Sequence, residues 1–295
     1  LTGLASGAGT SGGPHPARSI WGLYLTTCNN QEEQVIMATA VAKKAKAELA
    51  IMDENMFAAD AGIGVSDLGS EDLAIPFLKV LQKMSDELDD LDGAKAGDIY
   101  NTVTKDVVKG TEGVTVINCA YTLQYIEWEP RGTGTGAPHR IYGAGDEIPE
   151  TERGEDNKDY VKGGSGRYLE RTAQHYILIV DNDGMTQQAL LPMKSTQFKK
   201  SKQWNSAMRA LKMKDSGGNL FTPPRFSHVW KLETVSEENK NGSWHGWQIS
   251  KDRAVESPSI YAEAKLFAES ILAGQVNVKH VREEDKPSSD DDMPF

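Results

Sequence analysis

Residues 114–128 read VTVINCAYTLQYIEW, and this stretch decides the fold class. It is rich in Val, Ile, Thr, Tyr and Trp, which pack well on a pleated sheet and are enriched in strands. Its fifteen residues are long for one regular strand, so it predicts a bent strand or a strand with a β-bulge. From Gly113 onward we therefore expect a mainly β protein.

Two predicted hairpins follow this strand. Residues 171–180 form a second, largely apolar strand, and Asp181-Asn182-Asp183-Gly184 is a hairpin turn signal that leads into a returning strand over 185–193. Further on, residues 226–233 alternate between apolar and polar side chains, and Asn241-Gly242 marks another tight turn with a returning strand behind it. The sequence thus predicts five main strands.

Three helices are predicted around these strands. The first, over 196–213, carries a narrow apolar stripe. That stripe comprises Trp204, Ala207, Met208 and Leu211. A second helix begins at Ser257, a favoured N-cap, with Pro258 at its first position, and ends at Gly274. The apolar spacing within 76–84, after Pro76, predicts the third.

The order of the elements is a long strand, a hairpin, a helix and a second hairpin. This is the layout of the OB-fold, a five-stranded barrel with a helix between the third and fourth strands. Residues 129–170 then form a long insertion after the first strand. OB barrels are a common scaffold for single-stranded nucleic acid, although an analogy of fold alone does not establish a function.

Composition excludes several classes of protein. The 295 residues are 38% hydrophobic and 25% charged, the mix of a soluble globular protein. No apolar run approaches the roughly 20 residues that cross a bilayer, so we expect no membrane association. Cys28 and Cys119 are the two cysteines, which indicates no disulfide framework and fits a reducing compartment such as the cytoplasm.

The net charge of −11 taken alone argues against nucleic acid, but its distribution does not. Residues 283–295 contribute −5 and residues 53–92 contribute −9, which leaves +3 for the rest of the chain. Residues 194–214 carry seven Lys or Arg and no acid. We expect the body of the protein to bind a polyanion while an acidic tail stays free.

Four segments follow from these patterns. Residues 1–36 are interpreted as translated upstream sequence, because Glu32-Glu33 can be encoded by GAGGAG, a ribosome-binding sequence, nine nucleotides before the Met37 codon. Its apolar part is too short for a signal peptide. We expect residues 37–92 to be helical and acidic, and residues 93–281 to form the OB-like core with its C-terminal helix. Residues 282–295, charged and without apolar area to bury, are expected to be disordered.

The segment DDDMPF at the C-terminus combines three carboxylates with an apolar end that finishes in Phe. A partner protein can bind such a peptide with an apolar pocket for Phe and a basic rim for the acids. The alternative is an ordinary acidic tail. The expected partner-binding residues are Asp290, Asp291, Asp292, Met293, Pro294 and Phe295.

This tip resembles that of the bacterial single-stranded DNA-binding proteins, which typically reads DDDIPF. The body resembles the longer single-stranded DNA-binding proteins of tailed phages in three stretches. These are DLAIPFLKVL (72–81), GAKAGDIYNTVT (93–104) and YIEWEPR (125–131). The resemblance implies binding of single strands during phage DNA replication, recombination and repair, in the cytoplasm of a bacterial host. It also implies recruitment of a polymerase, helicase, primase or nuclease through the tip.

Single strands are held by aromatic side chains under the bases and by cations at the phosphates. The aromatic candidates are Tyr121, Tyr125, Trp128, Trp230, Trp244 and Trp247. The alternative for each is the core, and Trp244 and Trp247 cannot both be exposed on one regular strand. The cationic candidates are Arg131, Lys194, Lys199, Lys200, Lys202, Arg209, Lys212 and Lys214. Arg140, Arg167 and Arg171 flank glycine-rich loops that could close over a strand.

The sequence contains no positive sign of catalysis, so we do not expect an enzyme. The glycines of GTGTG (132–136) lack nucleotide-binding spacing, no histidine or cysteine spacing suits a metal, and no cofactor is expected. A strand-annealing or recombination factor, or a nuclease that shares the tail, is the alternative. The sequence does not determine the oligomeric state, and a homo-oligomer is one of the open alternatives.

Overall fold

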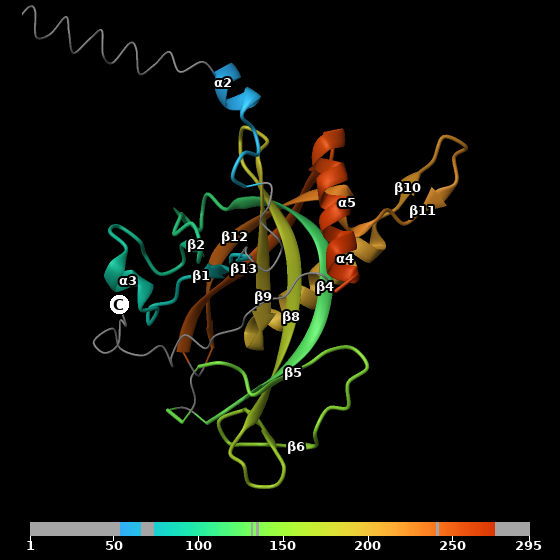
Figure 1. Ribbon diagram of the computed structural model, residues 1–295. Helices are drawn as coiled ribbons and strands as arrows, with labels where there is room; N and C mark the ends of the chain where they lie inside the picture. The colour runs from blue at the N-terminus through green and yellow to red at the C-terminus, as the bar shows by residue number, and fades with distance from the viewer. Residues whose placement is uncertain (1–53, 66–73, 131, 134–135, 240–241, 275–295) are drawn as a thin grey trace, which may run out of the picture. The chain divides into compact units, whose positions relative to one another are not determined.

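The computed structural model describes residues 54–65, 74–130, 132–133, 136–239 and 242–274 (Figure 1). The chain divides into two units, Leu1–Asp67 and Leu68–Phe295. In the described part of the first unit, residues 54–59 form the short helix α2 (Glu54–Ala59). The candidate site lies in the second unit.

The second unit is mainly β, as the sequence predicts. Its strands are β1 (Leu78–Val80), β2 (Ile99–Asn101), β3 (Val107–Val108), β4 (Val114–Trp128), β5 (Arg140–Tyr142), β6 (Thr151–Arg153), β7 (Asp159–Val161), β8 (Tyr168–Val180), β9 (Thr186–Lys194), β10 (Met213–Lys214), β11 (Leu220–Phe221), β12 (His228–Asn239) and β13 (Gly242–Ala254). Its helices are α3 (Glu87–Asp90), α4 (Phe198–Ala210) and α5 (Pro258–Leu272), with the 3-10 turns η1 (Ser195–Gln197) and η2 (Arg225–Ser227).

A curled antiparallel sheet organises this unit, with β4 and β8 at its centre (Figure 1). The strand order is β13-β12-β4-β8-β7-β6, while β9 pairs with β8 and β5 pairs with β4. The predicted bulge in β4 is confirmed between Asn118 and Ala120. Both hairpin predictions are also confirmed, since β8 pairs with β9 across Asp181–Gly184 and β12 pairs with β13.

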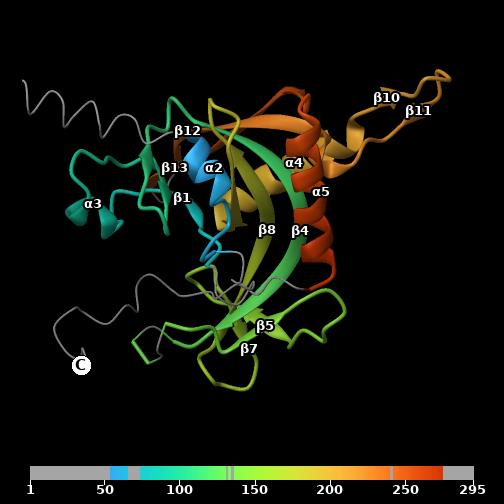
Figure 2. The same ribbon diagram turned by 45° about the horizontal axis from the view of Figure 1, so that its top comes forward.

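Each face of this sheet packs against one helix, and Figure 2 shows α4 and α5 beside the curled strands. On the α4 face, Trp204 and Met208 pack with Trp230, Leu232 and Trp247. On the α5 face, apolar side chains of α5 pack against β4 and β8. These contacts involve Ile117, Leu178, Ala264, Phe267 and Ile271. The predicted helix start is confirmed, because the Ser257 side chain accepts a hydrogen bond from the Ile260 N–H.

Among the described residues, no ladder joins β9 to β13, and β1 contacts both strands. On one side, the Leu190 N–H donates to the Pro76 carbonyl at 2.8 Å. On the other, the Gln82 amide bonds the backbone of His245 in both directions at 2.9 Å. The Gln197 side chain accepts from the Trp247 N–H at 3.0 Å. Two glutamine side chains therefore bond the edge of β13. We call this junction the seam.

The predicted helix after Pro76 is wrong. Residues 78–80 form β1, which pairs with β2, and Met84 is 94% exposed rather than part of an apolar face. Leu78 and Leu81 are buried, so the segment does contribute to the core, but as a strand. A short apolar run fits either period, and the neighbouring strand β2 decides between them.

Candidate nucleic-acid interface

The centre of the candidate site is on the α4 face of β4 and β8. Tyr121 and Tyr125 lie on this face, and Arg171 of β8 is directly opposite Tyr125 in the register. The Arg171 guanidinium carbon is 5.8 Å from the centre of the Tyr125 ring. Tyr125 is half-buried and Arg171 is exposed. A ring and a cation are thereby held side by side on a rigid sheet.

Helix α4 adds a second ring and a second cation. The Arg171 guanidinium carbon is 4.3 Å from the centre of the Phe198 ring, and the Lys202 Nζ is 5.1 Å from the same ring. Phe198 is the first residue of α4, so its ring extends toward β8 while Lys202, one turn later, stays exposed. Both contacts have the geometry of cation–π interactions.

Arg225 holds the inner end of this surface in place. Its guanidinium carbon is 5.4 Å from the centre of the Tyr121 ring. One of its nitrogens donates to the Asn205 side-chain oxygen at 2.9 Å and to that of Asn118 at 3.3 Å. Burial lowers the pKa of Arg225 and raises the pKa of Tyr121, while the nearby cations of Arg171 and Arg225 oppose the rise for Tyr121.

A buried polar network lies beneath this surface. The Asn118 side-chain amide is 2.9 Å from His175 Nδ1, and His175 Nε2 is 2.8 Å from Ser201 Oγ. Because an amide nitrogen only donates, Nδ1 accepts and the Nε2–H donates. Burial, and secondarily the cation of Arg225, lowers the pKa of His175 to about 3. The neutral imidazole connects β4, β8 and α4.

The contact between Ser201 and His175 pairs a hydroxyl with a base, which the sequence did not suggest. Both side chains lie in the core, at 1% and 0% exposure. The His175 ring lies between Tyr121 and Trp204, with ring centres 5.1 and 4.8 Å away. In this conformation a substrate does not reach the hydroxyl. The pair's evident role is to anchor α4 on the sheet.

We call the rings and cations above this network the aromatic–cation cluster. Its members are Tyr121, Tyr125, Arg171, Phe198, Lys202 and Arg225. Aromatic faces can stack on bases of any sequence, and cations can neutralise phosphates. The sequence had singled out Tyr121, Tyr125 and Lys202 as site residues and Arg171 as a loop-flanking arginine. Phe198 and Arg225 were missed, because their roles depend on tertiary contacts.

Three tryptophans expected at the interface belong to the core instead. Trp128, Trp230 and Trp247 are 4%, 3% and 2% exposed. Trp128 would share a face with Tyr125 only if a bulge intervened, but the register from Tyr125 to Trp128 is regular. It lies on the opposite face, and its indole N–H donates to Glu170 at 3.3 Å. No base can stack on these three rings in this conformation.

Cationic candidates fall into two groups. Lys199, Lys202 and Arg209 are exposed on α4, and Lys212 and Lys214 are exposed after it. Lys194 forms an ion pair with Glu170 at 3.0 Å, and Lys200 forms one with Glu237 at 2.6 Å. The hydrogen bond from Lys200 lowers the pKa of Glu237. The second group is therefore already partly neutralised by carboxylates.

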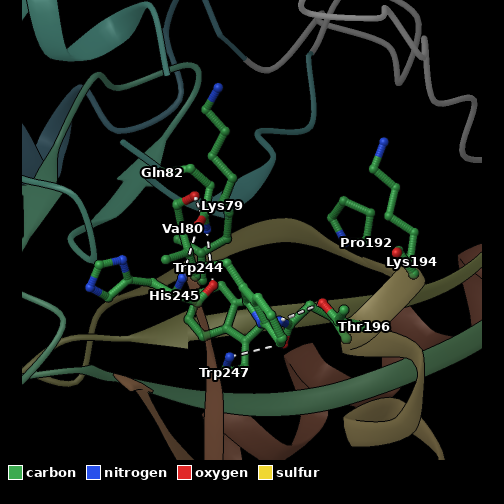
Figure 3. Close-up of a pocket in the computed structure, with 12 residues that line it drawn as sticks. Lys79, Val80, Gln82, Pro192, Lys194, Thr196, Trp244, His245 and Trp247 are labelled. Atoms are coloured by element: carbon green, nitrogen blue, oxygen red, sulfur yellow. Dashed lines mark hydrogen bonds between the residues drawn. The ribbon is translucent and has the colours of Figure 1, made fainter. Parts of the chain in front are cut away.

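The seam contains a pocket of about 290 Å³ that brings together Trp244, Trp247 and Lys194 (Figure 3). As expected for this strand, one indole is core and the other is not. Trp247 is buried, while Trp244 is half-buried and donates its N–H to Glu237 at 2.9 Å. In Figure 3 the Lys79 and Lys194 side chains extend away from the indoles. The pocket offers one partly accessible aromatic face.

Some expected site residues lie outside the described residues. These are Arg131 and the tip residues Asp290, Asp291, Asp292, Met293, Pro294 and Phe295. Within the described ranges, no group of three or more His, Cys, Asp or Glu residues is placed to hold a metal ion. In those same ranges, no helix has both the length and the apolar character to cross a membrane.

Together, these features define a mainly β protein whose curled sheet carries an aromatic and cationic surface beside one helix. The chain belongs to the Pam3 phage gp34-like protein family, whose model matches residues 42–277. The resemblance to a phage protein is thereby confirmed at the level of the family. No curated protein matches the chain, and no solved structure matches it.

Proposed function

We propose that this protein binds single-stranded DNA without sequence preference during phage DNA replication or recombination. The observation that carries the proposal is the aromatic–cation cluster, in which Arg171 contacts both Tyr125 and Phe198. Half-buried rings lie there beside the exposed cations of Arg171 and Lys202, which suits bases and phosphates of a single strand. A duplex hides its base faces and could not use the rings.

Strand order gives a second line of support. The set β13-β12-β4-β8-β9, with α4 between β9 and β12, is ordered as in an OB barrel that lacks its closing pair. At the seam, β1 and two glutamine side chains occupy the place of that pair. We therefore interpret the unit as an OB-like barrel with an inserted strand.

In the proposed mode, bases stack on Tyr125 and Phe198 while phosphates follow Arg171 and Lys202. Base–aromatic stacking contributes about 1–3 kcal/mol per base. Each phosphate neutralised on a single strand adds roughly 0.7 to the slope of log affinity against log salt. Arg225 and the network around His175 hold the sheet and α4 in register, so that the rings are positioned before DNA arrives.

The test is a titration of labelled oligo-dT by fluorescence anisotropy at several salt concentrations, with duplex DNA of equal length as the comparison. We expect Tyr125→Ala and Arg171→Gln each to weaken binding roughly tenfold or more, and Arg171→Gln also to reduce the salt slope. Lys265→Gln, an exposed cation on α5, is the matched control and should leave affinity unchanged. Equal affinity for the duplex, or equal losses in the control, would refute the proposal.

We extend the proposal to partner recruitment through residues 290–295. The support is the sequence of the tip, DDDMPF, because an aromatic anchor with acids suits a pocket with a basic rim. Pull-down of replication and repair enzymes with the intact protein and with Phe295→Ala tests this part. Capture that does not depend on Phe295 would contradict it.

A further inference from the structure

A small hairpin extends from the C-terminal end of α4. β10 and β11 pair as Met213 with Phe221 and Lys214 with Leu220. Both views show this hairpin projecting from the rest of the unit (Figures 1 and 2). We call residues 212–222 the arm. Two residues per strand make it far smaller than an independently stable hairpin.

The arm exposes large apolar side chains. Leu220 is 66% exposed, Phe221 42% and Met213 37%. Met213 and Phe221 share one face, while Leu220 lies beside Lys214 on the other. Several large apolar side chains together on a projecting element are typical of an interaction surface.

The tip of the arm is ordered in advance by its own hydrogen bonds. One Asp215 carboxylate oxygen accepts from the N–H groups of Gly217 and Asn219 at 2.8 Å, and the other accepts from the Asn219 side chain at 3.1 Å. These hydrogen bonds, with those from Asn219 foremost, lower the pKa of Asp215. Gly218 takes a positive φ of 82° at the turn, where a side chain would be strained.

The charge of this region identifies the kind of partner. Between residues 209 and 225 the chain carries Arg209, Lys212, Lys214 and Arg225, and Asp215 is the single acid. The Asp215 carboxylate is engaged in the turn. Lys202 and Arg209 are seven residues apart on α4, which places them on one side of the helix. A line of cations therefore leads from the aromatic–cation cluster to the arm.

We propose that the arm is a second contact for the same single strand, with a base stacked on Phe221 and phosphates at Lys212 and Lys214. This inference rests on the proposed function and extends it. An exposed ring whose cross-strand partner, Met213, has a lysine on either side suits a single-stranded polyanion. A second copy of this chain is the other candidate occupant, but a surface with the three exposed cations Arg209, Lys212 and Lys214 and one engaged acid does not complement itself.

Photocrosslinking of the full chain tests direct contact. We replace Phe221 with the photoreactive p-benzoylphenylalanine and irradiate the protein with labelled oligo-dT of about 30 nucleotides. The matched control carries the same group at Met185, which is 67% exposed on the turn between β8 and β9. We expect a crosslink from position 221 and none from position 185. Equal crosslinking at both positions, or none at 221, would overturn the inference.

Affinity measurements separate this inference from the proposed function. We expect Phe221→Ala to weaken oligo-dT binding roughly tenfold, about 1.4 kcal/mol, and Lys212→Gln with Lys214→Gln to lower the salt slope. If wild type binds and Arg171→Gln weakens binding while Phe221→Ala has no effect, the arm proposal fails alone. If wild type does not bind, the proposed function fails as well. If Phe221→Ala dissociates an oligomer without changing affinity per protomer, the arm instead binds a second copy.

Discussion

Replacing His175 with Gln should make the stability of this protein less sensitive to acid. The imidazole is fully buried and accepts from Asn118 while donating to Ser201. Burial lowers its pKa to about 3, against about 6.5 in an unfolded chain. A glutamine can accept and donate in the same places, but it does not titrate.

The sign and size of this pH dependence of stability follow from proton linkage. Below about pH 6.5, His175 binds a proton in the unfolded state but not in the folded state. The free energy of unfolding therefore falls as pH falls, until the folded pKa of about 3 is reached. Each pH unit in this window costs about 1.36 kcal/mol. Between about pH 7.5 and pH 5.0, His175 should therefore remove about 2 kcal/mol from the free energy of unfolding.

Urea denaturation of wild type and His175→Gln at these two pH values provides the assay. Carboxylates, and His228, whose pKa burial also lowers, titrate in both proteins, so they cancel in the difference between the two pH dependences. Ser201→Ala is the control, because it removes a hydrogen bond but keeps the buried imidazole. We expect it to lower stability at both pH values and to retain the wild-type pH dependence. If His175→Gln loses as much stability as wild type on acidification, the buried imidazole is not the source of the acid sensitivity.

Three further predictions concern the core, the seam and the tail. Trp204→Ala should lower the free energy of unfolding by about 3–5 kcal/mol, measured by chemical denaturation, because the buried indole packs α4 against His175 and Trp230. The control Ala207→Ser, on the exposed side of α4, should change the free energy of unfolding little. Gln197→Ala should lower the free energy of unfolding by about 1–3 kcal/mol and speed hydrogen exchange at the Trp247 amide, which loses its acceptor. Unchanged exchange at that amide would contradict the role of Gln197 at the seam. Deleting residues 283–295, which contribute −5, should tighten oligo-dT binding at low salt and have little effect at high salt; no change at low salt would contradict competition between tail and DNA.

Much of the secondary structure could be predicted because it depends on residues that are neighbours in the sequence. The β-branched run at 114–128, the turn residues 181–184 and the N-cap Ser257 each identify an element from neighbouring residues. Burial of Trp204 followed from its helical stripe and is confirmed at 2% exposure. The prediction for the segment after Pro76 was wrong because the local pattern there is ambiguous. A short apolar run fits a helix as well as a strand.

The candidate site was less accessible to prediction. Alternation along a strand shows which residues share a face, so Tyr121 and Tyr125 were grouped correctly. It does not show which face is covered, and for that reason Trp230 was expected at the surface although α4 and the sheet enclose it. Burial of an aromatic side chain depends on a neighbour that can lie far away in the chain.

Residue patterns alone were enough to indicate a mainly β protein with an acidic tail and a basic helix. The folded chain was needed to bring Arg171 onto Tyr125 and Phe198, to place Arg225 against the Tyr121 ring, and to put β1 at the seam. Periodicity is a property of one segment, so it can be recognised along the chain. Register and packing depend on contacts between segments that are far apart in the sequence, so they are defined only in the folded protein.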